Sequence, residues 1–262
     1  MRSGKPVAVF AVLLVVSFAT MNAMPSDTLL AALLQEAVLA LVALVVVGLA
    51  VPDALKRCTQ TVQQRSIVRF TAITLLLVGL VGGAITLLAW LFAGGGTMAC
   101  FASTALPSTA DLMENLLLLL GICLLTGLYE ESFMRVLGIE AFERALDTKR
   151  TILASAALFA LLHVGAPDVS AGQLVLLQTA LKFGQALLFG VILGALYVRT
   201  RRLWPCAFIH AGFDVLYMAP NVLLTGTMPE TYASGAVGDT VLLAVSVLML
   251  AGIVLKIRKE IA

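Results

Sequence analysis

The segment Leu29–Val51, LLAALLQEAVLALVALVVVGLAV, runs for 23 residues and contains one charged side chain, Glu36. A helix needs about 20 predominantly apolar residues to cross the hydrocarbon core of a bilayer. This segment is therefore predicted to span a membrane as an α-helix. The composition of the whole chain agrees, because 61% of its 262 residues are hydrophobic and only 12% are charged, whereas a soluble domain has about 25% charged residues.

Seven other segments are similarly apolar, which predicts an all-α, polytopic membrane protein with a bundle of about eight transmembrane helices in one integral membrane domain, residues 1–262. The predicted spans are roughly Pro6–Ala23, Leu29–Val51, Ile67–Ala93, Asn115–Val136, Thr151–Val164, Gln173–Val198, Leu203–Val222 and Thr240–Leu255. A short interfacial helix is expected at Gly138–Asp147, where apolar residues recur at helical spacing. A cleaved signal peptide is the alternative for the first segment, because it follows two basic residues.

The basic residues alternate between the loops in a regular way. Sixteen of the 17 Lys and Arg residues fall before the first span, after the last span, or in and beside every second loop, and the exception, Lys182, lies inside the sixth span. Lys and Arg collect on the cytoplasmic side of membrane proteins. The pattern predicts eight spans with both termini in the cytoplasm. The Ala-, Leu- and Val-rich composition suits a bacterial inner (cell) membrane, and the charge pattern also fits an endoplasmic reticulum membrane.

Several ionisable side chains lie in or beside these apolar segments, where each costs a few kcal/mol and needs a partner or a function. They are Glu36, Glu130, Glu131, Arg135, His163, Lys182, His210 and Asp214. Glu36 is expected to reach water near an outer helix end. Lys182 is interpreted as a structural residue that neutralises a buried acid or extends its ammonium to the membrane surface.

The spacing of these residues pairs some of them along a helix face. Glu131 and Arg135 are four residues apart, as are His210 and Asp214, so each pair shares one helix face. Glu130 is rotated from Glu131 by about 100° and is left to point elsewhere. Each feature alone also has a structural explanation, namely a buried ion pair or a hydrogen bond between helices.

Together, these acids and histidines suit the activation of a water molecule. A carboxylate in a poorly solvated site can act as a general base near neutral pH, and a neutral imidazole can share the proton or bind a metal. The chain has no Gly-x-Ser-x-Gly or HExxH motif, so serine chemistry and a zincin-type site are not indicated. Its four cysteines form no CxxC pair, and no zinc ribbon or redox pair is expected.

The polar residues form three short motifs, which resemble those of the CPBP family. This family, also called the Abi family, comprises the type II CAAX prenyl endopeptidases and bacteriocin-processing enzymes. Its pattern EExxxR, FxxxH and Hxxx(N/D), on an eight-helix core, is similar to Glu130-Glu131-x-x-x-Arg135, Phe159-x-x-x-His163 and His210-x-x-x-Asp214. The motifs lie in a catalytic core of about residues 115–222. The eukaryotic CAAX members have Asn at the last position, whereas this chain has Asp214, the form common among bacterial-type relatives.

The resemblance implies an intramembrane endopeptidase that cuts a membrane-associated peptide, of CAAX or leader type and with or without a lipid, near the cytoplasmic face. Glu130 would be the general base, assisted by His163. His210 and Asp214 would stabilise the oxyanion, although an ionised Asp cannot donate a hydrogen bond and could instead orient His210. The supporting residues would be Glu131, Arg135 and Phe159.

The same resemblance leaves the metal question open. The family is often described as metallopeptidases, and zinc or another divalent metal, if bound, would take its ligands from Glu130, His163, His210 and Asp214. The expected partners are the lipid bilayer and a peptide or protein substrate, and no nucleic acid. Two alternatives remain, a catalytically silent membrane scaffold or immunity protein on the same fold and a proton-coupled transporter, although the repeats and broken helices typical of transporters are not found.

Helix length poses one geometric problem. His163 lies 13 residues after Arg150, or about 20 Å along a straight helix. Glu130 and His210 lie only about 8–11 Å from the basic ends of their own helices by the same arithmetic. The fifth span is therefore expected to tilt, or to begin below the membrane surface, if the three side chains are to meet.

Overall fold

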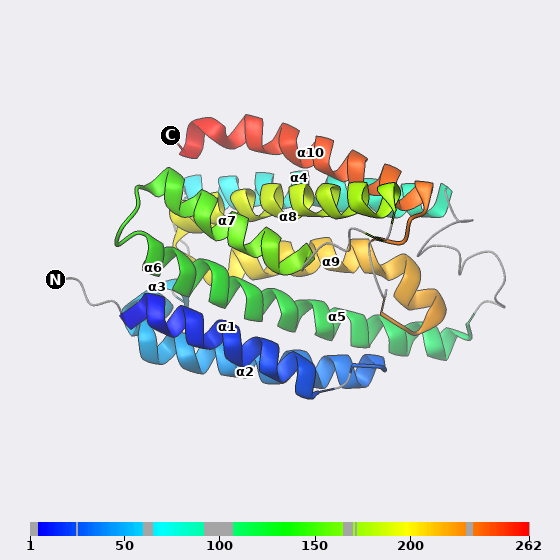
Figure 1. Cartoon of the computed structure of the whole chain (residues 1–262), viewed down its shortest axis with the longest axis horizontal. Coiled ribbons are helices and arrows are strands. Elements are labelled where there is room, and N and C mark those ends of the chain that lie inside the picture. The colour runs from blue at the N-terminus through cyan, green and yellow to red at the C-terminus, as the bar shows by residue number, and fades with distance from the viewer. Residues whose placement is uncertain are drawn as a thin grey trace.

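The computed structural model describes residues 5–24, 26–59, 65–91, 107–164, 170, 172–228 and 233–261. These residues form an all-helical bundle without strands (Figure 1). The long helices are α1 (Lys5–Ala23), α2 (Leu29–Ala50), α4 (Arg65–Leu91), α5 (Thr109–Glu131), α7 (Thr148–Val164), α8 (Gln173–Thr200), α9 (Leu203–Thr225) and α10 (Val237–Ile261). The short elements are α3 (Pro52–Thr59), the π-helix η2 (Ser132–Ile139) and α6 (Glu140–Phe142).

The helices confirm the prediction of a polytopic membrane protein. Among the described residues, 7 helical segments are long and apolar enough to cross a membrane. The fifth predicted span, Thr151–Val164, is not among these seven. It corresponds to α7, whose 17 residues fall short of the roughly 20 that a bilayer requires. Figure 1 shows α7 crossing the bundle obliquely, which agrees with the tilt expected from the position of His163.

The first motif lies where an α-helix changes into a π-helix. α5, η2 and α6 follow one another without a break and form a single apolar segment, Thr109–Phe142. The interfacial helix predicted at Gly138–Asp147 is not a separate element, because its helical part continues this segment and ends at Phe142. The separate short helix is α3, which the sequence analysis missed. π-helical turns inside α-helices are frequent at functional sites.

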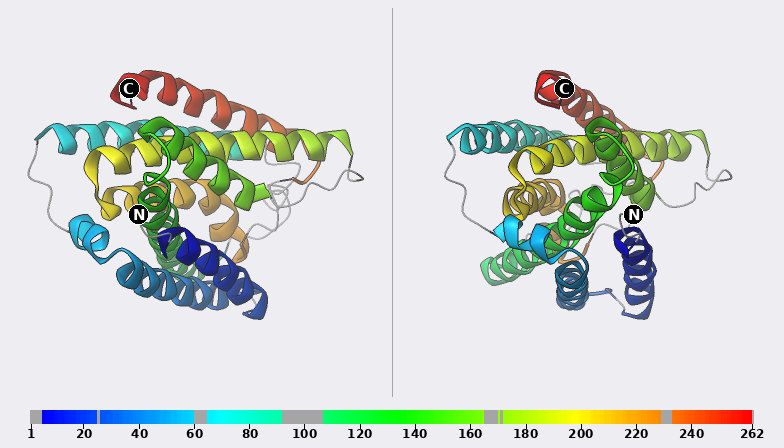
Figure 2. Two further views of the ribbon diagram at one scale, coloured as in Figure 1. Left: turned by 60° about the vertical axis from the view of Figure 1, so that its left-hand side comes forward. Right: turned by 90° about the vertical axis from the view of Figure 1, so that its left-hand side faces the viewer.

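Close helix packing brings the three motif-bearing helices together. Figure 2 shows α10 at one edge of the bundle and α1 and α2 at the opposite edge, with α5, α7 and α9 between them. A Cβ atom on Gly127 of α5 would lie 2.6 Å from the carbonyl oxygen of Ala207 on α9. The absence of a side chain there permits the close approach of the two backbones, as small residues do between membrane helices. This contact lies three residues before Glu130 and three before His210.

α1 is an integral part of the bundle. The ring of Phe10 lies 4.5 Å from that of Phe133 in η2 and 5.7 Å from that of Phe142 in α6. Leu13 is 1% exposed. The face of α1 directed at the bundle therefore packs against the helix that carries the first motif.

One end of the bundle carries a layer of ion pairs. α1 begins and α10 ends at this end (Figure 1). Arg57 lies 3.0 Å from Glu140, and Arg201 lies 2.6 Å from Glu143. Burial opposes the charge of Arg201, but the hydrogen bonds and negative charge of Glu143 outweigh it and raise the pKa of the guanidinium. The predicted basic side of the membrane protein thus corresponds to one end of the structure.

Candidate active site

The seven residues singled out by the motifs converge on one region of the bundle. Glu130 and Glu131 end α5, and Arg135 follows in η2. α7 carries Phe159 and His163, while α9 carries His210 and Asp214. The segments are far apart in the chain, so only the packing of α5, α7 and α9 brings them together.

Glu131 and Arg135 form the closed side of the site. Both side chains are 0% exposed, and the Arg135 Nε atom donates to Glu131 Oε2 over 2.8 Å. Arg135 also donates to Ser155 Oγ over 3.2 Å, and this hydroxyl donates to the Met134 carbonyl over 2.9 Å. The guanidinium lies over the Phe159 ring, 4.9 Å from its centre. The predicted pairing of Glu131 with Arg135 is confirmed. The hydrogen bond from Arg135 to Ser155 joins η2 to α7.

His210 connects this closed side to the other acids. Its Nδ1 atom lies 2.9 Å from Glu131 Oε1. Because the paired Glu131 carboxylate accepts hydrogen bonds, the ring donates from Nδ1 and turns Nε2 the other way. Nε2 lies 3.5 Å from Glu130 Oε2 and 3.4 Å from Asp214 Oδ2. His210 is 2% exposed, and the edge contacts of its ring with Phe159 and Phe189 further restrict its orientation.

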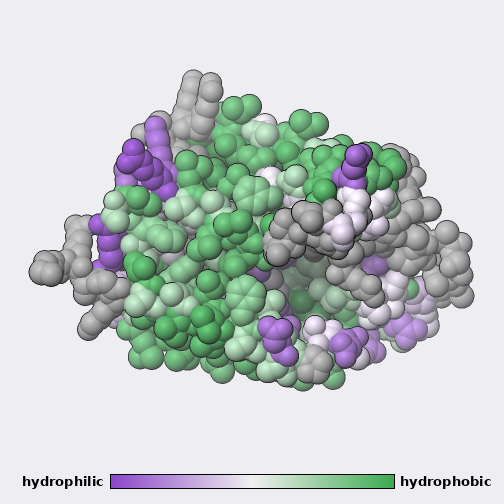
Figure 3. Space-filling model, in the orientation of Figure 1, coloured by the Kyte–Doolittle hydropathy of each residue, from purple (hydrophilic) through white to green (hydrophobic). Residues whose placement is uncertain are grey.

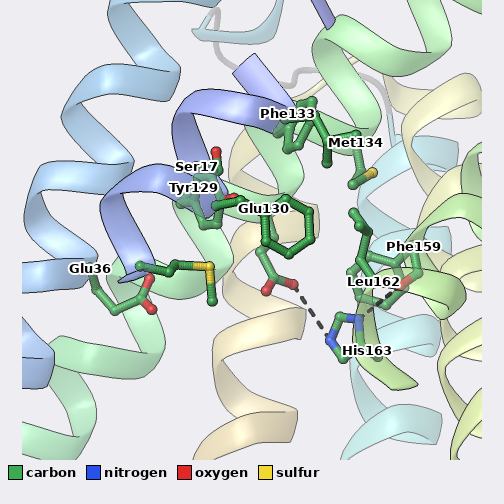
Figure 4. A pocket seen from close by; sticks show the side chains of 12 residues that line it. Ser17, Glu36, Tyr129, Glu130, Phe133, Met134, Phe159, Leu162 and His163 are labelled. Carbon is green, nitrogen blue, oxygen red and sulfur yellow. Dashed lines mark hydrogen bonds and ion pairs between the residues drawn. The ribbon is translucent and has the colours of Figure 1, made fainter. Parts of the chain in front are cut away.

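His163 approaches Glu130 from α7. Its Nδ1 atom lies 2.9 Å from the Phe159 carbonyl oxygen, and a carbonyl can only accept, so Nδ1 carries the proton. In the neutral ring, Nε2 then bears a lone pair, and this atom lies 3.9 Å from Glu130 Oε2 (Figure 4). The structure thus turns Nε2 of both histidines toward the same carboxylate oxygen.

Glu130 differs from its neighbour by facing a cavity. The cavity has a volume of about 220 Å³ and is lined by α1, α2, α5, η2 and α7, with mostly apolar side chains around Glu130 and His163 (Figure 4). Glu130 Oε2 accepts no hydrogen bond from the described residues. Figure 3 shows the surface hollowed on the side of the bundle where α5 runs between the ends of α1 and α7. The carboxylate therefore has room beside it for a water molecule and a peptide bond.

A second, smaller cavity adjoins the site on the far side of His163. Its volume is about 30 Å³, and its polar lining comprises His163, Lys182, Gln185, His210 and Asp214. A space of this size with several polar partners is large enough for a water molecule.

The arrangement does not form a ready metal site. Among the described residues, no three His, Cys, Asp or Glu side chains are grouped so that they could hold a metal ion. The four residues named as ligands from the resemblance lie near one another but do not provide such a group. No step of the chemistry below is derived through a metal.

Two residues have a place that the sequence analysis did not assign. Glu36 was expected to reach water, but it lines the Glu130 cavity, and its Oε2 atom is buried without a hydrogen bond from the described residues. Lys182 was interpreted as a structural residue, and it lines the smaller cavity together with Asp214. Both are charged residues inside apolar segments, and this was the available signal, although hydropathy does not say which neighbour a side chain will meet.

The geometry defines a helical membrane protein with an acid–histidine site buried between its helices. Residues 112–216, which contain all three motifs, match the family model of the type II CAAX prenyl endopeptidase Rce1-like proteins. The match confirms the resemblance to the CPBP intramembrane peptidases and supports an intramembrane endopeptidase in general. Comparison with curated proteins gave no match.

Proposed function

We propose that this protein is an intramembrane endopeptidase in which Glu130 activates the attacking water, with residues of about 115–222 as the catalytic core. One observation carries the proposal: Glu130 Oε2 is free of protein hydrogen bonds among the described residues, faces a cavity, and has the Nε2 atoms of two histidines within 3.9 Å. A non-catalytic scaffold has no need for an unpaired carboxylate in such a position, because burying it without a partner is costly.

The reaction begins with proton transfer from water to Glu130. The water oxygen forms a bond to the carbonyl carbon of the peptide, and the tetrahedral intermediate breaks at the C–N bond as Glu130 returns the proton to the leaving nitrogen. His163 assists through its Nε2 lone pair, which can accept the second hydrogen of the same water. The water is thereby oriented by two acceptors.

His210 acts on the oxygen of the substrate carbonyl. Its Nδ1 atom is committed to Glu131, so in the imidazolium form Nε2 donates toward the cavities and stabilises the developing oxyanion. Asp214 stabilises that imidazolium at 3.4 Å. Glu131, Arg135 and Phe159 hold the ring of His210 in place and act as positioning residues.

The substrate is a membrane-associated peptide, of CAAX or leader type. Most side chains that line the larger cavity are apolar, and its opening lies on the flank of the bundle (Figure 3), where a lipid-anchored or hydrophobic segment would arrive. Glu130 precedes Glu140 of the ion-pair layer by ten residues, or about 15 Å of helix. If that layer marks the cytoplasmic surface, cleavage takes place inside the membrane on its cytoplasmic side.

The orientation follows from the basic residues. We infer that both termini and the Lys56–Arg69 region are cytoplasmic in a bacterial inner membrane. A reporter enzyme that works only in the cytoplasm is expected to be active when it is fused after Ala262, and one that works only outside the cytoplasm is expected to be inactive. A reporter that reads extracytoplasmic would contradict the eight-span orientation.

The activity is tested with purified protein in lipid nanodiscs and a panel of peptides, with and without a prenyl group, analysed by mass spectrometry. We expect a defined scission product that is missing with Glu130→Gln. A folded wild-type protein that cleaves none of the panel but binds a partner favours the scaffold or immunity function. Solute flux driven by a pH gradient across proteoliposomes favours the transporter.

A further inference from the structure

Lys182 is the basic residue that departs from the distribution of all the others. It is the tenth residue of α8 and the one Lys or Arg of the 17 that lies inside a predicted span away from the basic end. Its side chain lines the small cavity together with His163, His210 and Asp214. A charged side chain at such a depth needs a partner or a function.

A chain of hydrogen bonds fixes one side of the ammonium group. Lys182 Nζ donates to Gln185 Oε1 over 3.0 Å, and Gln185 Nε2 donates to Ser246 Oγ on α10 over 2.7 Å. The Ser246 hydroxyl in turn donates to the Leu243 carbonyl over 2.8 Å. Nζ also lies 5.3 Å from the centre of the Tyr217 ring. The contact with Gln185 orients the ammonium group.

The small cavity brings the ammonium group to the residues of the site, because Lys182 lines it together with His163, His210 and Asp214. Asp214 in its ionised form only accepts hydrogen bonds, whereas an Asn at the same position could donate one. Asp214 therefore provides a hydrogen-bond acceptor at a position where a donor would stabilise the oxyanion. The Lys182 ammonium, which is a donor, lines the same small cavity.

We propose that Lys182 and Asp214 act as one unit, in which the Lys182 ammonium donates a hydrogen bond to the oxyanion of the tetrahedral intermediate beside His210. This inference rests on the proposed peptidase function. The small cavity, with a volume of about 30 Å³, accommodates one oxygen-sized group between these donors. Lys182 keeps its protons throughout: the bond from the water oxygen forms, the C–N bond breaks, and Glu130 carries the transferred proton.

The pairing makes the two residues interdependent, which a double-mutant cycle measures. Lys182→Met removes the donor and one of the two cationic groups near Asp214, the other being His210, so kcat should fall by about 10²–10³-fold with little change in KM. Asp214→Asn supplies a donor but removes the charge that stabilises the His210 imidazolium, so kcat should fall by about tenfold. In the Asp214→Asn background, Lys182→Met should then cost less than about tenfold. A loss from Lys182→Met that is smaller in the Asp214→Asn background than in the wild type is the result expected for two residues that act as a unit.

Two further variants separate a catalytic contact from mere filling of space. Lys182→Arg keeps a cationic donor and should retain most of the activity. Lys256→Met, on the exposed part of α10, is the matched control and should leave the cleavage rate unchanged. An equal loss from Lys182→Met in both backgrounds, or no loss in either, would overturn the inference.

Thermal melting of the same variants in detergent measures the pairing through stability. It shows whether each variant is folded, and it does not depend on the proposed activity. Lys182→Met should lower the melting temperature, and the added Asp214→Asn should recover part of that loss, because the carboxylate that lost one of its cationic neighbours is then gone. If wild-type protein cleaves nothing, the peptidase proposal fails while the melting cycle still decides the pairing. If wild type cleaves and both cycles show no coupling, only the role of Lys182 is wrong.

Discussion

The two sides of the first motif use the same kinds of side chain in opposite environments. On the closed side, Glu131 and Arg135 are 0% exposed, and they bond to each other and to neighbouring polar groups. On the cavity side, the Glu130 and His163 side chains are 21% and 26% exposed and lie 3.9 Å apart. Consecutive glutamates thus differ in their surroundings, because Glu131 is fully matched by partners and Glu130 faces the cavity, and we expect this difference to separate their functions.

This difference suggests a division of labour. The closed side fixes η2 to α5, α7 and α9, and it orients His210 through Nδ1. The cavity side leaves a carboxylate and an imidazole nitrogen facing open space. A rigid network of satisfied hydrogen bonds supporting a partly unsatisfied group is the arrangement expected where position matters for chemistry.

The largest effect is expected on the cavity side. Glu130→Gln removes the base without stranding a cation, since no Arg or Lys pairs with Glu130 among the described residues. Cleavage should fall by about 10²–10⁴-fold, with the melting temperature unchanged or raised. Paired measurements of the cleavage rate and of melting in detergent test this. If Glu130→Gln remains substantially active while Glu131→Gln is folded and inactive, the base is assigned to the wrong carboxylate.

Substitutions on the closed side should mainly lower the stability of the folded protein. Glu131→Gln or Arg135→Gln leaves an unmatched buried charge, which costs about 3–5 kcal/mol. Expression or melting temperature should therefore drop together with activity. Arg135→Lys is an informative companion, because it keeps the charge but loses the forked geometry, and it should be intermediate. Unchanged melting for Glu131→Gln would show that the pair does not hold η2 in place.

A smaller effect is expected where the closed side reaches α7. Ser155→Ala removes the hydroxyl that accepts from Arg135 and donates to the Met134 carbonyl. Leaving those buried groups without a partner should cost about 1–3 kcal/mol of stability. The cleavage rate at a temperature well below melting should change little, because the Glu131–Arg135 pair remains. A large loss of rate without a loss of stability would instead place Ser155 on the catalytic side.

The smallest effect is expected at the ion-pair layer at the end of the bundle. Arg57 pairs with Glu140 at 3.0 Å, but its side chain is 49% exposed. Exposed pairs contribute about 0–1 kcal/mol, so Arg57→Ala should leave both melting and cleavage nearly unchanged. Compared with Arg135→Gln, this variant isolates the contribution of burial to an Arg–Glu pair. A loss as large as that at Arg135 would contradict the comparison.

The positions of Glu36 and Lys182 show where prediction from the sequence stopped. Both stood out as charges in apolar segments, yet one was expected to reach water and the other to be structural. Which way a side chain points from a membrane helix depends on how that helix rotates against its neighbours. Hydropathy and i,i+4 spacing describe only residues that are close in sequence, so they do not show how one helix is rotated against another.

The sequence by itself determined the class of protein, the long helices and the motif residues, because apolar length and helical spacing are local properties that a bilayer enforces on each segment. It also predicted the pairing of Glu131 with Arg135, since those residues lie one turn apart. Only the tertiary structure decided the π-helical turn after Glu131, the oblique path of α7 and the meeting of both histidines at Glu130. These features arise from packing between segments distant in sequence, such as Gly127 against the backbone of α9, and the free energy of such contacts belongs to the assembled bundle rather than to any one helix.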